Sequence, residues 1–234
     1  MRARLFPAPS VIGRQFLDML QEGGIIASPL LHHLLVSLYR LFLAVLIGTA
    51  AGVVVGVTTG FKPTLEAFTR PFISFFLPIP GIALAPLFLI LLGFGNPTIL
   101  TTGALAAFFP VAFNTTYGIR TVNNTLIHAA EIMGATKWQV LRHVYLPWSA
   151  IHIFTGFKLG VSRCWRTVIA VELIAAADWG LGYMVMESVE YLQMSTVYVG
   201  IILMACVFLV IEKGLIGFFE NRTIHKWGIM EGRN

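Results

Sequence analysis

The chain has 234 residues, of which 57% are hydrophobic and only 12% are charged, and its mean hydropathy is +0.81. Soluble domains carry about 25% charged residues, so this composition excludes an ordinary soluble enzyme and a disordered chain, and an integral membrane protein remains. The net charge of +5 comes from Lys and Arg scattered singly, which argues against a nucleic-acid-binding protein. Cys164 and Cys206 lie in apolar stretches and are interpreted as packing residues.

Five segments are apolar over about 20 residues, the length that crosses a bilayer. They are residues 33–60, 72–93, 97–118, 148–174 and 196–218. None of them alternates as a strand does, so the sequence predicts an all-α, polytopic transmembrane helical bundle.

Two of these segments carry further structural signals. In the first, small residues recur every four positions and predict a face for close helix packing; they are Gly48, Gly52, Gly56 and Gly60. The second contains Pro78, Pro80 and Pro86, which predict either a broken helix lining a cavity or a plain kink.

The distribution of Lys and Arg between the segments predicts the orientation. The stretches 61–71, 119–147 and 213–234 contain nine of these residues, whereas 94–96 and 175–195 contain none. Positive charge favours the cytoplasmic side, so residues 119–147 and the C-terminus are predicted to be cytoplasmic. Five spans then make residues 1–32 an external N-terminal segment and residues 33–234 the transmembrane domain. Because the external segment would carry basic residues across the membrane, two alternatives stay open: the chain starts outside, or a preceding span is missing.

The cytoplasmic stretch at 124–146 reads as two short helices. Asn123 or Asn124 can cap a helix that Gly134 ends, and Thr136 with Gln139 forms the pattern of a capping box for a second helix. Leu146-Pro147 is expected to end that second helix. By composition alone, these helices would lie on lipid headgroups.

The spacing in this stretch resembles a known family. Ala129-Ala130, Gly134 and Leu146-Pro147 are similar in register to the "EAA" motif of ABC importer permeases, with His128 in place of the motif's Glu and Val144 in place of its Ile. Leu5–Ser10, Arg70–Pro80 and Trp165–Gly182 resemble segments of the nitrate, sulfonate, taurine and bicarbonate subgroup. Members of this subgroup usually carry one more span before the Pro-rich segment, which is absent from this sequence.

The resemblance implies a type I ABC permease fold and an importer of a small anionic solute, without enzymatic activity of its own. The motif positions imply coupling to the ATPase through His128, Ala129, Ala130, Glu131, Gly134, Ala135, Leu146 and Pro147, with Glu131 a candidate substitute for the carboxylate missing at His128. A cytoplasmic ATPase dimer would bind ATP and Mg, and a periplasmic solute-binding protein would dock on the acidic, irregular segment 178–193. A second permease copy or a paralogue would complete the pathway in the bacterial inner membrane.

The fifth segment contains Arg163, Arg166 and Glu172, and two interpretations of these charges stay open. They pair with other helices, or they line a translocation path that favours an anion. The alternative function is an ion-coupled secondary transporter that uses Arg166 and Glu172. The sequence contains no phosphate-binding G-x-x-x-x-G-K-[ST] loop, no metal-binding helix motif and no discernible catalytic set.

Overall fold

The computed structural model describes residues 6–22 and 28–216, and every regular element in these ranges is helical, which confirms the all-α prediction. The helices are α2 (Pro9–Gln21), α3 (Pro29–Phe61), α4 (Pro63–Phe76), α5 (Ala85–Leu92), α6 (Asn96–Arg120), α7 (Asn124–Ile132), α8 (Lys137–Val140), α9 (Leu146–Ala175), α10 (Leu181–Glu190) and α11 (Met194–Leu209). A 3₁₀ turn, Gly81–Leu84, precedes α5, and π-helical turns follow α8 (Leu141–Tyr145) and α11 (Val210–Ile216).

The helices form two compact units, and α3, α6 and α9 contribute to both. The first unit contains the described residues up to Ala44, Gly81–Gly103 and the described residues from Trp165 onward; the second contains Val45–Pro80 and Ala104–Cys164. Each unit is described by itself.

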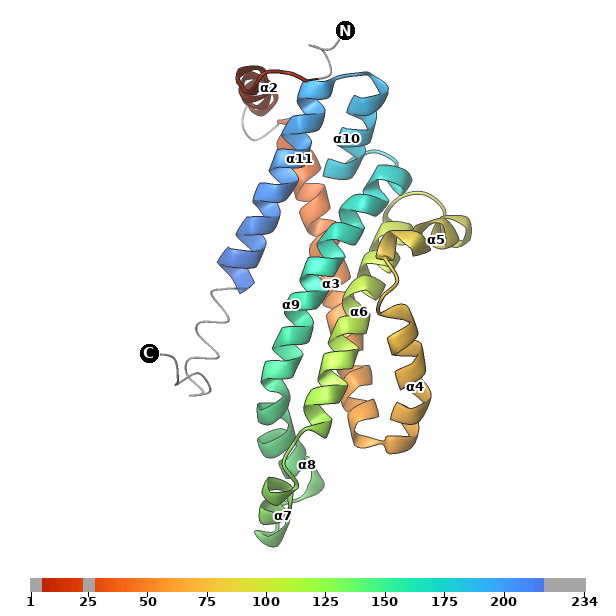
Figure 1. Ribbon diagram of the computed structural model, residues 1–234, viewed down its shortest axis with the longest axis vertical. Helices are drawn as coiled ribbons and strands as arrows, with labels where there is room; N and C mark the ends of the chain where they lie inside the picture. The colour runs from red at the N-terminus through yellow and green to blue at the C-terminus, as the bar shows by residue number, and fades with distance from the viewer. Residues whose placement is uncertain (1–5, 23–27, 217–234) are drawn as a thin grey trace. The chain divides into compact units, whose positions relative to one another are not determined.

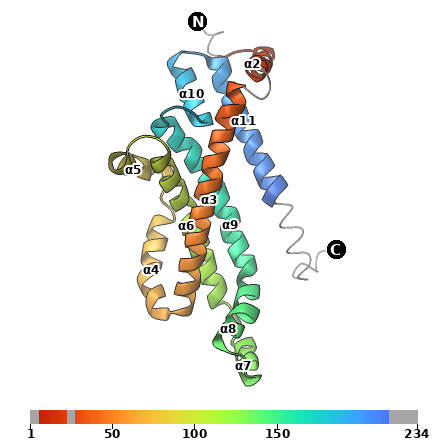
Figure 2. The ribbon, with the colours of Figure 1, turned by 180° about the vertical axis from the view of Figure 1, so that it is seen from behind.

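In the first unit, α10 and α11 form an antiparallel pair joined by a short turn, and α2 lies beside α11 (Figures 1 and 2). Apolar residues of different helices are buried together in this unit: Ile99, Val168, Val171 and Leu181. The α2 helix begins with Pro9 at its first position, where the missing N–H of proline is tolerated. It occupies much of the segment for which the sequence predicted only an external position.

In the second unit, α3 packs on α6 along its row of glycines, and α4 runs back beside the end of α3 (Figure 1). A Cβ atom built at Gly52 would lie 2.8 Å from Cβ of Val111, and one at Gly60 would lie 2.6 Å from Cβ of Ile119. Because these distances are shorter than van der Waals contact, only glycine permits this approach of the two backbones.

The α4 helix occupies most of the stretch 61–71, which the sequence places between two predicted spans. Pro63 occupies the first turn of α4 and Glu66 lies in the same turn, where a carboxylate interacts favourably with the helix dipole. Arg70 is exposed on α4, and Lys62 is the residue that precedes its first turn.

Within the part of the chain that the structure describes, fewer helices qualify as membrane spans by length and hydropathy than the five predicted. Among the described residues, three helices are long and apolar enough to cross a membrane, namely α3, α6 and Met194–Gly214. Two further helical segments reach the required length and hydropathy only when they are taken together as one bent span, namely Pro63–Phe76 and Gly81–Leu92. The number of spans rises to four if this pair crosses the membrane once. The predicted span 148–174 lies within the continuous helix α9, but it is not among the qualifying helices. The predicted end of the last span at 218 and the basic C-terminal tail lie outside the described residues.

Candidate functional site

The first helix of the predicted coupling loop, α7, is closed at both ends by local hydrogen bonds. At its start, the Thr125 N–H donates to the Asn123 side chain (2.9 Å), so Asn123 is the cap. At its end, the Gly134 N–H donates to the Glu131 carbonyl (2.9 Å) and the Ala135 N–H donates to the Ala130 carbonyl (3.0 Å). This pair of bonds is a Schellman motif, which requires a left-handed residue, and Gly134 has a φ of 79°.

The second helix starts directly after this glycine. The Gln139 N–H donates to Oγ1 of Thr136 (3.3 Å), and the Thr136 N–H donates to Oε1 of Gln139 (2.7 Å), which completes a capping box. Because the end of α7 and the start of α8 are both capped, the α7–α8 segment has a defined local geometry.

The expectation that Leu146-Pro147 ends the second helix is wrong. The chain continues from α8 through the π turn Leu141–Tyr145 directly into α9, whose first residue is Leu146. The Leu146 N–H donates to the carbonyl of Leu141, five residues back. Since Pro147 has no N–H to donate, the wider π turn accommodates it without breaking the helix. The α8 segment is thereby physically continuous with a long helix of the bundle.

The α7–α8 segment exposes large apolar side chains. The exposed fractions are 86% for Ile132, 80% for Met133 and 67% for Trp138, whereas Ala130 is buried. Beside them, Nδ1 of His128 lies 3.4 Å from Oε2 of Glu131, and both side chains are exposed. A cluster of this kind on a polar loop is typical of a protein–protein contact.

Glu172 lies in a buried ion pair within the first unit. Its Oε1 is 2.9 Å from Nη1 of Arg40 on α3, and its Oε2 accepts from Oγ of Ser37 (2.7 Å) and from the Gly182 N–H (3.0 Å). The Glu172 side chain is 0% exposed and that of Arg40 is 5% exposed. For Glu172, the structure therefore supports the interpretation that the charge pairs with another helix.

The same network fixes the turn that precedes α10. The Gly180 N–H donates to Nδ1 of His33 (3.1 Å), and the Leu181 N–H donates to Oγ of Ser37 (2.8 Å). Gly180 has a φ of 138°, and a Cβ atom there would lie 2.7 Å from Nη1 of Arg40. Three consecutive backbone N–H groups thus bind to side chains of α3 and α9, which stabilises the start of α10.

The two arginines of α9 lie in different units. In the second unit, the Arg163 guanidinium donates to the carbonyls of Leu77 and Ile79, in the stretch between α4 and the 3₁₀ turn. It therefore satisfies backbone groups that the broken helix leaves open. In the first unit, Arg166 is exposed.

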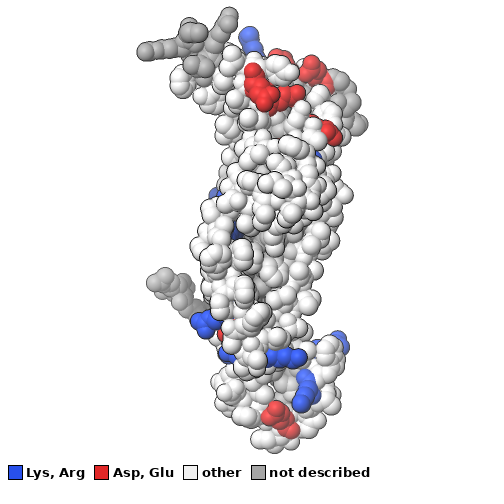
Figure 3. Space-filling view, turned by 90° about the vertical axis from the view of Figure 1, so that its right-hand side faces the viewer, with Lys and Arg blue, Asp and Glu red and all other residues white. Residues whose placement is uncertain are grey.

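The predicted docking segment 178–193 is helical over Leu181–Glu190, which corrects the expectation of an irregular segment. Figure 3 shows acidic side chains gathered on the first unit and, separately, Lys and Arg gathered on the second. A cavity of about 500 Å³ is lined by Tyr183, Glu187, Glu190 and Tyr191 among others. The negative charge of Glu187 raises the pKa of the half-buried Tyr183 phenol. This side of the first unit therefore presents an acidic, aromatic surface.

Sequence reasoning missed two groups of site residues. Glu172 was not paired with its partners on α3, which are more than 130 positions away in the chain, although Arg40 is a charge within an apolar segment. The exposure of Ile132 and Met133 was not predicted from the sequence. Within the described residues, no group of three His, Cys, Asp or Glu side chains could hold a metal ion.

These features define a class of protein: a helical membrane protein with a capped loop that exposes large apolar side chains and with charges buried between its helices. The family of binding-protein-dependent transport system inner membrane components matches residues 48–225, and the chain belongs to this family.

Individual relatives show which transport permeases the chain resembles. The chain is 35% identical to the taurine transport system permease protein TauC of Escherichia coli (strain K12), over 89% of this chain and 76% of the relative. It is 32% identical to the protein named "Putative aliphatic sulfonates transport permease protein SsuC" of Bacillus subtilis (strain 168), over 88% and 72%. It is 25% identical to the bicarbonate transport system permease protein CmpB of Synechococcus elongatus, over 85% and 70%. The chain is thus an ABC transporter permease of the subgroup that the sequence motifs indicated.

Proposed function

We propose that this chain is the permease subunit of an ABC importer that moves a small anionic solute of the nitrate, sulfonate or taurine type into the cytoplasm. ATP and Mg bind to a separate ATPase dimer, whose hydrolysis drives transport. The observation that carries the proposal is the capped α7–α8 segment with its exposed Ile132, Met133 and Trp138, in a chain of the permease family.

The α7–α8 segment suits a docking element mechanically. Its caps fix the angle between the two short helices, and the π turn connects α8 to α9 without a break. A push from a bound ATPase would therefore move α9 as a rigid body rather than bend a loop. We assign the contact to the exposed Ile132, Met133 and Trp138 together with the motif residues His128, Ala129, Glu131, Gly134 and Ala135. Ala130, Leu146 and Pro147 would hold the segment in place. Glu131 supplies a carboxylate next to His128, where the family motif has one.

The remaining partners follow from the family. A periplasmic solute-binding protein would dock on the acidic surface around α10, and a second permease copy would enclose the pathway. The C-terminus and α7–α8 would face the cytoplasm. Arg163 and Arg166 are the proposed positive charges along the path, and they favour an anion by Coulomb attraction in a low-dielectric environment.

Uptake into proteoliposomes tests the proposal. Vesicles containing the chain with its cognate ATPase would enclose ATP and Mg, and the binding protein with radiolabelled taurine, an alkanesulfonate or nitrate would be added outside. The proposal predicts uptake that requires enclosed ATP and persists with ionophores, and that a Gly134→Asp variant loses. Uptake that is abolished by an ionophore and does not depend on enclosed ATP would instead support an ion-coupled carrier.

A further inference from the structure

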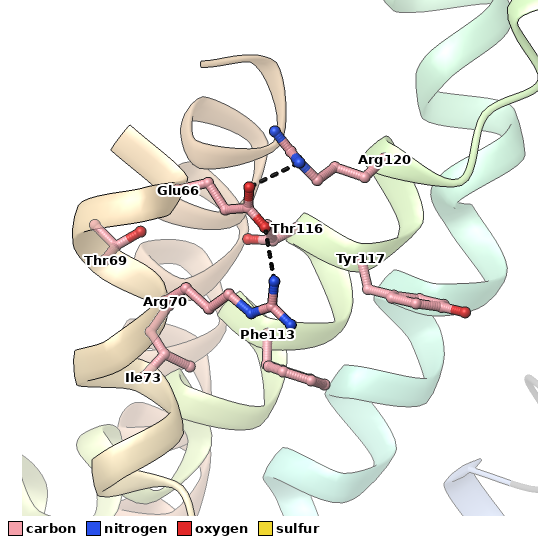
Figure 4. Close-up of a pocket in the computed structure, with 8 residues that line it drawn as sticks. All are labelled: Glu66, Thr69, Arg70, Ile73, Phe113, Thr116, Tyr117 and Arg120. Carbon is pink, nitrogen blue, oxygen red and sulfur yellow. Dashed lines mark ion pairs between the residues drawn. The ribbon is translucent and has the colours of Figure 1, made fainter. Parts of the chain in front are cut away.

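A second charged site lies in the second unit, away from the α7–α8 segment. It is a cavity of about 280 Å³ between α4 and α6 (Figure 4). Its lining repeats at the same helical spacing on both helices, so one face of each contributes: Glu66, Thr69, Arg70 and Ile73 from α4, and Phe113, Thr116, Tyr117 and Arg120 from α6. This volume lies just below the range for small-molecule sites, about 300–1,000 Å³, and suits a single small group.

The charges in this cavity are unbalanced. Oε2 of Glu66 lies 2.7 Å from Nη1 of Arg120, whereas Oε1 lies 3.9 Å from Nη1 of Arg70. Figure 4 shows the Glu66 carboxylate between the two guanidinium groups. One carboxylate cannot neutralise two arginines, and each guanidinium has five N–H donors. The cavity therefore has a net positive charge and N–H donors in excess of the carboxylate's needs.

The two threonine hydroxyl groups of the cavity already have acceptors, which leaves the guanidinium groups as the charged donors beside the Tyr117 phenol. Thr69 donates to the Leu65 carbonyl (2.8 Å), and Thr116 donates to the Ala112 carbonyl (2.9 Å). The charged donors for a ligand are thus the guanidinium groups, which favour phosphate and sulfonate oxygens because their planar N–H pairs match these geometries. The Glu66 side chain is only 16% exposed, and its ion pair with Arg120 holds that guanidinium in position.

The surroundings of the cavity are apolar. Phe68 and Phe72 are exposed on α4 with ring centroids 5.3 Å apart, and Phe113 and Tyr117 are exposed on α6. Exposed aromatic rings next to arginines at the end of a spanning helix are typical of the membrane interface. On the proposed orientation, this end faces the cytoplasmic leaflet, where anionic lipids concentrate and basic pockets between helices bind their headgroups.

We infer that the α4–α6 cavity binds a phosphate or sulfonate oxyanion through Arg70 and Arg120, and that the phosphate of an anionic phospholipid is its ligand in the membrane. Glu66 orients Arg120 and leaves Arg70, whose side chain is 72% exposed, to close over the bound group. The site is separate from the docking segment and does not depend on the transported solute.

Native mass spectrometry of the full chain, released from nanodiscs of phosphatidylglycerol or of phosphatidylcholine, tests the inference. We expect retained phosphatidylglycerol on the native chain and about tenfold less on Arg70→Gln, because a hydrogen bond to a charged group is lost. Lys62→Gln, which removes one positive charge from the same end of α4 outside the cavity, serves as the matched control and retains the lipid. A Glu66→Gln/Arg120→Gln double variant removes the ion pair as a unit, so that no charge is left buried and unpaired, and it also loses the lipid.

A second arm separates the two sources of the oxyanion. Inorganic phosphate and methanesulfonate are titrated into the detergent-solubilised chain, and the unfolding temperature is followed. Stabilisation by these ions that Arg70→Gln abolishes, without preference for phosphatidylglycerol in nanodiscs, supports the cavity but makes a soluble ion its ligand. Equal loss of lipid in Arg70→Gln and Lys62→Gln, or no binding in either arm, overturns the inference.

Discussion

The buried pair of Arg40 and Glu172 predicts a large and specific loss of stability when only one partner is removed. Arg40→Met deletes the guanidinium but leaves the Glu172 carboxylate in a site where its side chain is 0% exposed. The Trp179 carbonyl, which accepts from Arg40 Nη1 (2.5 Å), and the Asn96 side chain, which accepts from its Nε (2.7 Å), lose their donor too.

The magnitude follows from the desolvation of the remaining charge. Breaking a buried ion pair on one side costs about 3–5 kcal/mol. The Ser37 hydroxyl and the Gly182 N–H still donate to Glu172, so we expect the lower end of this range, about 3 kcal/mol. Adding Glu172→Gln to Arg40→Met neutralises the unpaired charge and keeps the shape of the side chain. We expect this second substitution to restore about 2 kcal/mol of the free energy of unfolding, a coupling energy in the range for residues in direct contact.

Equilibrium unfolding in mixed micelles, with sodium dodecyl sulfate as the denaturant and helicity as the signal, measures these free energies. Arg14→Met is the matched control, because Arg14 is exposed on α2 and its loss should change stability by less than about 0.5 kcal/mol. If Arg40→Met is no less stable than Arg14→Met, or if the effects of Arg40→Met and Glu172→Gln simply add, the pair does not stabilise the fold as argued.

Three further predictions concern single residues. Gly52→Ala is expected to lower the free energy of unfolding by about 1–3 kcal/mol because its Cβ would press on Val111. Gly13→Ala, which has open space around it, should raise the free energy of unfolding by about 0.5–1 kcal/mol. Equal effects of the two substitutions in the same unfolding assay would disprove close packing at the glycine row. Gly134→Ala should cost about 1–2 kcal/mol of local stability, since φ is positive there, and faster hydrogen exchange of the Ala135 amide would report it. Arg163→Gln should destabilise the chain by about 1.5–3 kcal/mol through the lost charged donor to the Leu77 carbonyl, and an unchanged unfolding curve would exclude that role.

Features set by neighbouring residues were predictable from the sequence. Asn123, Gly134 and the pair Thr136 and Gln139 act over three or four positions, so the pattern alone predicts the caps of α7 and α8. The four-residue spacing of glycines likewise predicts a packing face, although it does not identify α6 as the partner.

Features set by distant residues were not predictable. Arg40 and Glu172 are 132 positions apart, so nothing local pairs them. The continuation of the helix through Pro147 depends on the π turn Leu141–Tyr145, which no residue pattern in that stretch predicted. The charges of α9 are accommodated by an ion pair at Glu172 and by hydrogen bonds from Arg163 to backbone carbonyls.

Co-purification tests the central claim, that the α7–α8 segment couples this permease to an ATPase. A C-terminally tagged chain and its Gly134→Asp variant would be solubilised mildly from the native host beside Gly13→Asp, a glycine substitution outside the segment, and their partners identified by mass spectrometry. The account predicts an ABC ATPase with the native chain and with Gly13→Asp, and its loss from Gly134→Asp. An ATPase retained by Gly134→Asp, or absent from the native chain in several mild detergents, would contradict it.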